Sequence, residues 1–206
     1  MSLQVIGAGL ARTGTTSLKL ALERLLRRPV YHWREMISRP EHVRAWHEAV
    51  HGRPPAWSEL LEPYGAAVSV PASAFWRELA DANPEALIIL STRDDPERWW
   101  ESLNGTLLTR FRLPAAPESP MARAADMATD LWQSRIGAGD INDKKAMIAA
   151  YERHNEAVRA HAAPERLLDW RPSDGWEPIA TRLGVPVPET PFPWENTRAQ
   201  FRAQTA

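Results

Sequence analysis

Residues 7–17 read Gly-Ala-Gly-Leu-Ala-Arg-Thr-Gly-Thr-Thr-Ser, a glycine-rich turn between two regular elements. The residues before it, Leu3 to Ile6, form a short apolar run that predicts a buried strand. The residues after it, Gly14 to Leu26, carry leucine and alanine at helical spacing, which predicts an amphipathic helix. A strand, a glycine turn and a helix in this order favour anion binding, because backbone N–H groups meet the positive end of the helix.

The rest of the chain alternates short apolar runs with amphipathic segments. Further strands are predicted at residues 29–32, 66–70, 86–90 and 166–170. This alternation predicts right-handed βαβ units, and therefore an α/β fold of three layers with a central parallel sheet. Residues 104–160 would form a mostly helical insertion before the last strand. We expect a single domain over residues 1–206.

Ligands of such folds bind at the carboxyl ends of the parallel strands. That edge of the predicted sheet gathers the segments 7–17, 31–35, 69–72 and 91–102. Candidate functional residues are therefore sought in these four segments.

Composition limits the classes of function. The 206 residues are 44% hydrophobic and 25% charged, with a formal net charge of −1, so nothing global favours nucleic acid or an anionic membrane. The absence of cysteine excludes thiolate metal sites and a cysteine nucleophile. The N-terminus has no basic region of the kind that starts a signal peptide, and no apolar stretch is long enough to span a membrane. We expect a cytoplasmic protein.

The glycine-rich turn fits two familiar nucleotide loops poorly. A dinucleotide fingerprint would use Gly7 and Gly9, but its last glycine position holds Arg12, and no acidic residue follows the second strand. A nicotinamide-dependent reductase is therefore the less favoured alternative. A nucleoside-triphosphatase loop would use Gly9 and Gly14, but its lysine position holds Thr15, so the charge that binds the terminal phosphates is missing.

A third interpretation keeps the loop geometry and takes the positive charge from Arg12. Residues 11–17, Ala-Arg-Thr-Gly-Thr-Thr-Ser, resemble the 5′-phosphosulfate loop of sulfotransferases, whose pattern is Pro-Lys-Ser-Gly-Thr-Thr-x. The segments 31–35, 75–79 and 175–178, with the proline-rich tail to residue 196, are similar to one branch of that family.

The resemblance implies a P-loop-like fold and the donor 3′-phosphoadenosine 5′-phosphosulfate, which leaves as 3′,5′-adenosine bisphosphate. Its loop residues here would be Arg12, Thr13, Gly14, Thr15, Thr16 and Ser17. A second family signature is an arginine at the end of an apolar strand with a serine in the next helix, and both bind the 3′-phosphate. In this chain these are Arg93 and Ser102. The resemblance requires no metal.

The catalytic base is less clear. Relatives carry histidine or aspartate at the position of Ser69, and a serine is a weak base without an activating partner. His32 and Glu35 lie at the same predicted edge and are alternative bases, while Arg12 would neutralise charge on the leaving oxygen. The acceptor would be a hydroxyl or amine of a small molecule. The other hypothesis is a catalytically impaired nucleotide-binding homologue, with Ser69 as its marker.

One pair of histidines lies outside these segments. His47 and His51 are four residues apart on a predicted helix, which is a spacing that suits metal ligands. Their flanking residues offer no third ligand, so we interpret the pair as surface residues.

Overall fold

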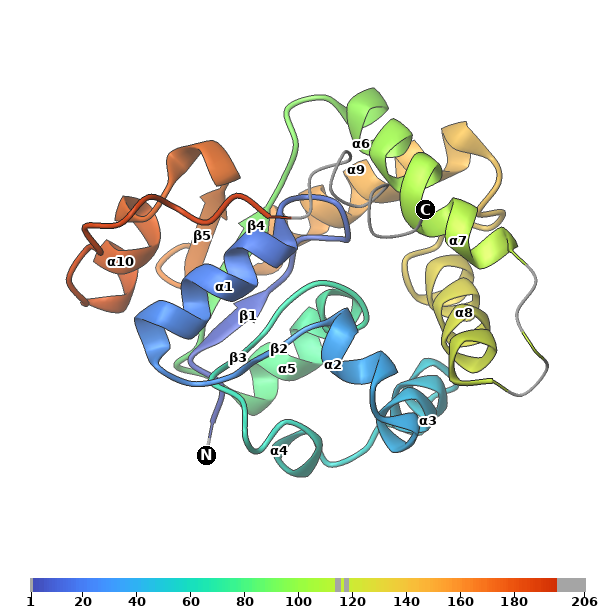
Figure 1. The fold of residues 1–206 in the computed structure, drawn as a ribbon, viewed down its shortest axis with the longest axis horizontal. Helices are drawn as coiled ribbons and strands as arrows, with labels where there is room; N and C mark the ends of the chain where they lie inside the picture. The colour runs from blue at the N-terminus through green and yellow to red at the C-terminus, as the bar shows by residue number, and fades with distance from the viewer. Residues whose placement is uncertain (1, 114–115, 117–118, 196–206) are drawn as a thin grey trace.

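The computed structural model describes residues 2–113, 116 and 119–195. A sheet of parallel strands in the order β2-β3-β1-β4-β5 runs through the centre of this part of the chain (Figure 1). The strands are β1 (Val5–Gly7), β2 (Val30–Tyr31), β3 (Ala66–Ala67), β4 (Leu87–Ser91) and β5 (Leu167–Trp170). The predicted α/β fold with a central parallel sheet is confirmed.

Successive strand residues face opposite sides of the sheet, and each side has its own apolar core. Val5 pairs in register with Leu87, and both belong to the core on one face. The next pair, Ile6 and Ile88, belongs to the core on the other face. The strand β4 is buried on both faces, which explains why it reads as an almost unbroken apolar run.

Helices complete the two outer layers. One core contains residues of α1 (Thr15–Leu26) and α10 (Glu177–Leu183). The opposite core contains residues of α5 (Trp76–Ala82), α6 (Pro96–Leu103) and α9 (Lys144–His161). Further helices are α2 (Trp33–Ile37), α3 (Pro40–Val50), α4 (Trp57–Leu60), α7 (Thr109–Arg112) and α8 (Pro120–Asp130). Short 3₁₀ segments span Ala72–Phe75 and Pro172–Asp174, and π-helical turns span Asn104–Leu108 and Leu131–Arg135.

Two predicted elements have different boundaries in the structure. The sequence at 34–50 predicts a helix whose second half starts at Pro40, and the structure has two separate helices there, α2 and α3, because Arg39 before Pro40 is extended. The strand expected at 66–70 ends at Ala67, and Ser69 has a φ of 66°, which no strand allows. The chain therefore turns sharply at Ser69, the position at which the resemblance implies a catalytic base.

The described residues between β4 and β5 are mostly helical, as predicted. It contains α6 to α9 and lies on the carboxyl-end side of the sheet (Figure 1). Trp99 of α6 stacks on Tyr151 of α9 with ring centroids 4.2 Å apart, and its Nε1 donates to the carbonyl of Ala11. This contact ties the insertion to the glycine-rich loop. Within the described residues, no helix is long and apolar enough to cross a bilayer.

Candidate active site

The glycine-rich loop ends in a left-handed residue that starts α1. Gly14 has a φ of 89° and a ψ of 17°, a conformation that side chains disfavour. A Cβ added there would also lie 2.2 Å from Cγ of Pro172, in the turn that follows β5. Glycine is therefore required twice, by the backbone conformation and by the close approach. No side chain caps the N-terminus of α1 through its N-cap residue Gly14, and a helix N-terminus after such a loop is suited to bind an anion.

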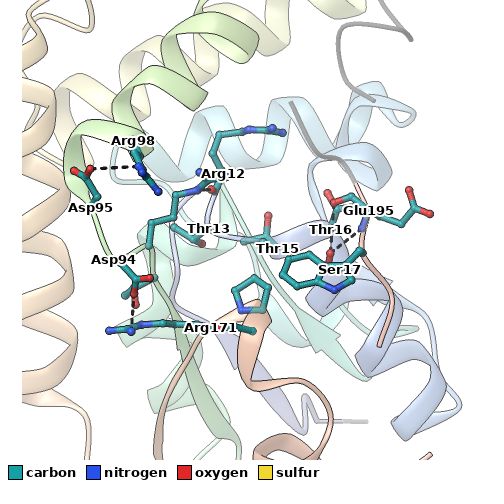
Figure 2. Close-up of a pocket in the computed structure, with 16 residues that line it drawn as sticks. Arg12, Thr13, Thr15, Thr16, Ser17, Asp94, Asp95, Arg98, Arg171 and Glu195 are labelled. Atoms are coloured by element: carbon teal, nitrogen blue, oxygen red, sulfur yellow. Dashed lines mark hydrogen bonds and ion pairs between the residues drawn. The ribbon is translucent and has the colours of Figure 1, made fainter. Parts of the chain in front are cut away.

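A cavity of about 340 Å³ opens in front of this loop (Figure 2). Its lining contains every residue predicted to hold the donor except Ser102. These residues are Arg12, Thr13, Gly14, Thr15, Thr16, Ser17 and Arg93. The structure adds residues that the sequence analysis did not select, namely Thr92, Asp94, Asp95, Arg98, Arg171, Pro172, Ser173, Trp194 and Glu195.

Two arginines that line this cavity are in contact with each other. Arg12 is only 7% exposed and its Nε donates to Oγ of Ser102 at 3.2 Å. The Nε of Arg93 donates to the backbone carbonyl of Arg12 at 2.7 Å. Burial, and next the charge of Arg93, lower the pKa of Arg12 to about 10. A buried guanidinium with a second guanidinium beside it indicates an anion site, because an anion would offset their repulsion.

Two further arginines at this cavity have acidic partners. Arg98 pairs with Asp95 at 3.7 Å and Arg171 pairs with Asp94 at 2.6 Å, as Figure 2 shows. Arg171 comes directly after β5, so the rule that ligands bind at strand ends could have selected it from the sequence. Arg98 carries no such signal, because an arginine in a helix is usually exposed to solvent.

The hydroxyl groups of the loop have different partners. The hydroxyl of Thr13 bonds the carbonyl of Leu10 and the hydroxyl of Ser91, each at 2.7 Å, and so fastens the loop to β4. The Oγ of Ser17 accepts a 3.0 Å hydrogen bond from the backbone N–H of Glu195. This bond seats the proline-rich tail beside the loop, which the sequence pattern did not predict.

A second cavity of about 190 Å³ lies behind the loop and is mostly apolar. Its walls come from α2, α7, α8 and the segment after β3. They are formed by Ala11, Arg12, Thr15, Thr16, His32, Trp33, Arg34, Ile37, Ser69, Val70, Leu107, Arg110, Phe111 and Met121. Arg12, Thr15 and Thr16 line both cavities, so the two meet at the loop.

Arg12 in this shared wall and Ser69 in the second cavity have strained backbones. Their φ angles are 72° and 66°, a region that residues with a side chain rarely adopt. Ser69 is 2% exposed and lines the second cavity. Strain of this kind costs on the order of 1–3 kcal/mol and concentrates at functional sites.

His32, a predicted base, lies in the wall of the second cavity. Its Nδ1 accepts a 3.4 Å hydrogen bond from the backbone N–H of Arg34, which caps α2. Burial, and then the charges of Lys19 and Arg34, lower the pKa of His32 to about 3. The ring is therefore uncharged at neutral pH, and with Nδ1 as an acceptor its proton is assigned to Nε2.

Glu35, the other predicted base, is not among the described residues that line either cavity. Its Oε1 pairs with Nζ of Lys19 at 3.3 Å, and Lys19 also pairs with Glu23 at 2.6 Å. Its Oε2 is buried and has no hydrogen-bond partner in the described part of the chain. The sequence analysis placed Glu35 at the correct edge of the sheet, but its carboxylate points to α1.

The fold and the loop are those of a sulfotransferase domain. A sequence profile described as a sulfotransferase domain matches residues 4–201, so the chain belongs to that family. The chain is also similar to Ava biosynthesis cluster protein M of Aspergillus versicolor, with 32% identity over 216 residues. That alignment covers 93% of this chain and 80% of the relative.

Proposed function

We propose that the protein transfers a sulfuryl group from 3′-phosphoadenosine 5′-phosphosulfate to a small-molecule acceptor. The observation that carries this proposal is the shared wall of the two cavities. One cavity is rich in arginine and hydroxyl groups, the other is mostly apolar, and Arg12, Thr15 and Thr16 belong to both. Sulfuryl transfer needs the donor and the acceptor held next to each other, with a positive charge at the point where they meet.

The residues of the first cavity fit this donor. Its phosphates and sulfate need several cations and N–H donors, and the cavity offers Arg12 and Arg93 beside the N-terminus of α1. Trp194 also lines this cavity and is 60% exposed, so its ring is accessible for stacking with the adenine of the donor. When bound, the donor supplies a sulfuryl group attached to a phosphate oxygen.

Arg12 is the residue that we place at the reacting centre. It lies between the two cavities, its charge would stabilise the leaving oxygen, and Ser102 holds its guanidinium. Arg93 would hold a phosphate farther along the first cavity, because its Nε is already bonded to the carbonyl of Arg12. Thr15 and Thr16 would add donors at the start of α1.

The acceptor would bind in the second cavity. Trp33 and Phe111, whose ring centroids are 5.7 Å apart, give it an aromatic wall, and Arg34 and Arg110 add positive charge. His32 would donate a hydrogen bond from Nε2 to the acceptor, since a base with a pKa of about 3 removes protons poorly at pH 7. The site therefore favours an acceptor whose hydroxyl ionises readily, such as a phenol, with Arg12 stabilising the oxyanion.

Calorimetric titration with 3′,5′-adenosine bisphosphate tests the donor site. Arg12→Ala and Arg93→Ala should each weaken binding by about tenfold to one hundredfold, as expected for a charge-assisted bond. Arg44→Ala, at an exposed arginine that lines neither cavity, is the matched control and should leave the affinity unchanged. Equal affinity in all variants would refute the assignment.

Transfer itself is tested by following labelled sulfate from the donor to a phenol and to an aliphatic alcohol of similar size. We expect the phenol to react faster. Equal rates would mean that a base outside His32 and Ser69 serves the reaction.

A second candidate function is a nucleotide-binding protein with little turnover. Two observations favour it, the serine at position 69 and the low pKa of His32. It predicts tight binding of the bisphosphate with no transfer to either acceptor.

A further inference from the structure

The structure supplies a third ligand for the histidine pair of α3. His47 and His51 lie on successive turns of that helix, and Asp130 ends α8, which packs against α3 (Figure 1). The Nε2 of His47 lies 3.1 Å from Oδ2 of Asp130, and the Nε2 of His51 lies 3.7 Å from the same oxygen. The sequence could not show this contact, because Asp130 is more than seventy residues away along the chain.

The ring of His51 is oriented as a metal ligand usually is. Its Nδ1 lies 2.8 Å from the carbonyl of His47, so it donates there, and the uncharged ring has a lone pair on Nε2. That lone pair faces the carboxylate of Asp130. A metal ion between this nitrogen and the carboxylate oxygen would contact both.

The spacing of the three groups suits a small divalent ion. Each offers one ligand atom, and these atoms lie within 4.8 Å of one another. Zinc binds histidine nitrogen and carboxylate oxygen at about 2.0–2.1 Å, so neighbouring ligands of a tetrahedral ion are about 3.3 Å apart. The observed 3.1 Å and 3.7 Å lie on either side of that value. The contact therefore needs only small side-chain movements to close around an ion.

We propose that His47, His51 and Asp130 bind one divalent transition-metal ion of the zinc type. Imidazole and carboxylate ligands favour such an ion over magnesium or calcium, which prefer oxygen alone. The three side chains are 40–45% exposed, so an ion and a completing water molecule have access from solvent. None of the three lines the donor or the acceptor cavity, so the site is separate from the proposed chemistry.

The bound ion would join α3 to α8. The first turn of α8 carries Met121, which lines the acceptor cavity. The ion would therefore hold a wall of that cavity in place from the other end of the helix. It would stabilise the folded chain by binding it in preference to the unfolded one.

Calorimetric titration of the untagged protein with Zn²⁺ tests this site. We expect one saturable ion per chain, and at least about tenfold weaker binding in each of His47→Ala, His51→Ala and Asp130→Asn. The absence of cysteine removes thiolate competition from the titration. All three positions are exposed enough that the variants should fold, which circular dichroism and Tm would verify.

His161→Ala is the matched control. His161 is also an exposed helical histidine whose Nδ1 bonds a carbonyl one turn earlier, that of Ala157 at 2.8 Å, but the described residues place no carboxylate against it. This variant should bind Zn²⁺ like the unchanged protein. Failure of the unchanged protein to bind one ion, or unchanged affinity in any of the three ligand variants, would overturn the proposal.

Discussion

The Nε of Arg12 donates a 3.2 Å hydrogen bond to Oγ of Ser102, which joins the glycine-rich loop to α6. The family resemblance implies that Ser102 binds the 3′-phosphate together with Arg93. In the structure Ser102 is 4% exposed, is not among the residues that line the donor cavity, and contacts the other arginine. We therefore expect Ser102 to act through Arg12.

Ser102→Ala should lower transfer more than it lowers nucleotide affinity. Removing the hydroxyl takes away one hydrogen bond that holds the Arg12 guanidinium, and a hydrogen bond to a charged group contributes about 1.5–3 kcal/mol. We expect kcat to fall by about tenfold or more, with a smaller change in bisphosphate affinity than Arg93→Ala produces. Steady-state kinetics and calorimetry measure the two effects. Thr109→Ala, an exposed hydroxyl in α7, is the control. A larger effect on binding than on kcat would mean that Ser102 contacts the nucleotide directly.

Gly14→Ala should destabilise the chain and abolish bisphosphate binding. Gly14 has a positive φ, and an added Cβ would clash with Pro172, so the loop must move. Gly52→Ala is a matched control, because Gly52 has a φ of 81° but no atom within 4 Å of an added Cβ. In that control the free energy of unfolding should fall only by the cost of a side chain at positive φ, about 1–2 kcal/mol. Thermal unfolding should give a clearly larger loss at position 14. Equal losses would show that the contact with Pro172 is unimportant.

The sequence predicted the parts of the site that depend on short stretches of chain. The loop, the helix that follows it and Arg93 at the end of β4 are each contained in one strand–turn–helix unit, where local spacing determines geometry. The buried β4 was recognisable because both its faces are covered, which leaves an apolar run. These elements lie where the sequence analysis placed them.

Contacts between distant segments could not be predicted. The tail reaches Ser17 through the N–H of Glu195, and Asp130 meets His47 across two helices. No local pattern encodes either approach, because each depends on how whole elements pack. Glu35 shows the same limit, since its place at the correct edge did not reveal that its carboxylate pairs with Lys19.

Acid should destabilise the fold through His32. Its pKa falls from about 6.5 in the unfolded chain to about 3 in the folded one, so between these values the unfolded state binds more protons. The contribution of His32 to the free energy of unfolding is fully present above pH 6.5 and is lost as the pH falls toward 3. The expected loss between pH 7 and pH 5 is about 2 kcal/mol. Burial also lowers the pKa of His154, which adds a loss of the same sign.

Denaturant unfolding at several pH values checks this prediction. His32→Asn should make the free energy of unfolding depend less on pH, because asparagine can still cap α2 but does not titrate. His161→Asn, at an exposed histidine, should leave the slope as it is. A variant at position 32 with an unchanged slope would show that another group causes the acid sensitivity.

Glu195→Gln should strengthen binding of the bisphosphate. Glu195 lines the donor cavity beside Ser17, so its carboxylate would repel the phosphates, while its backbone N–H keeps the bond to Ser17 in the variant (Figure 2). Because the side chain is exposed, salt screens this repulsion, and we expect a gain of about threefold at low salt that fades above about 0.5 M. Glu189→Gln, farther back in the tail and outside that lining, is the control and should have no effect. Weaker binding in the Glu195→Gln variant at any salt concentration would instead mean that the carboxylate supports the nucleotide, for example by holding a ribose hydroxyl.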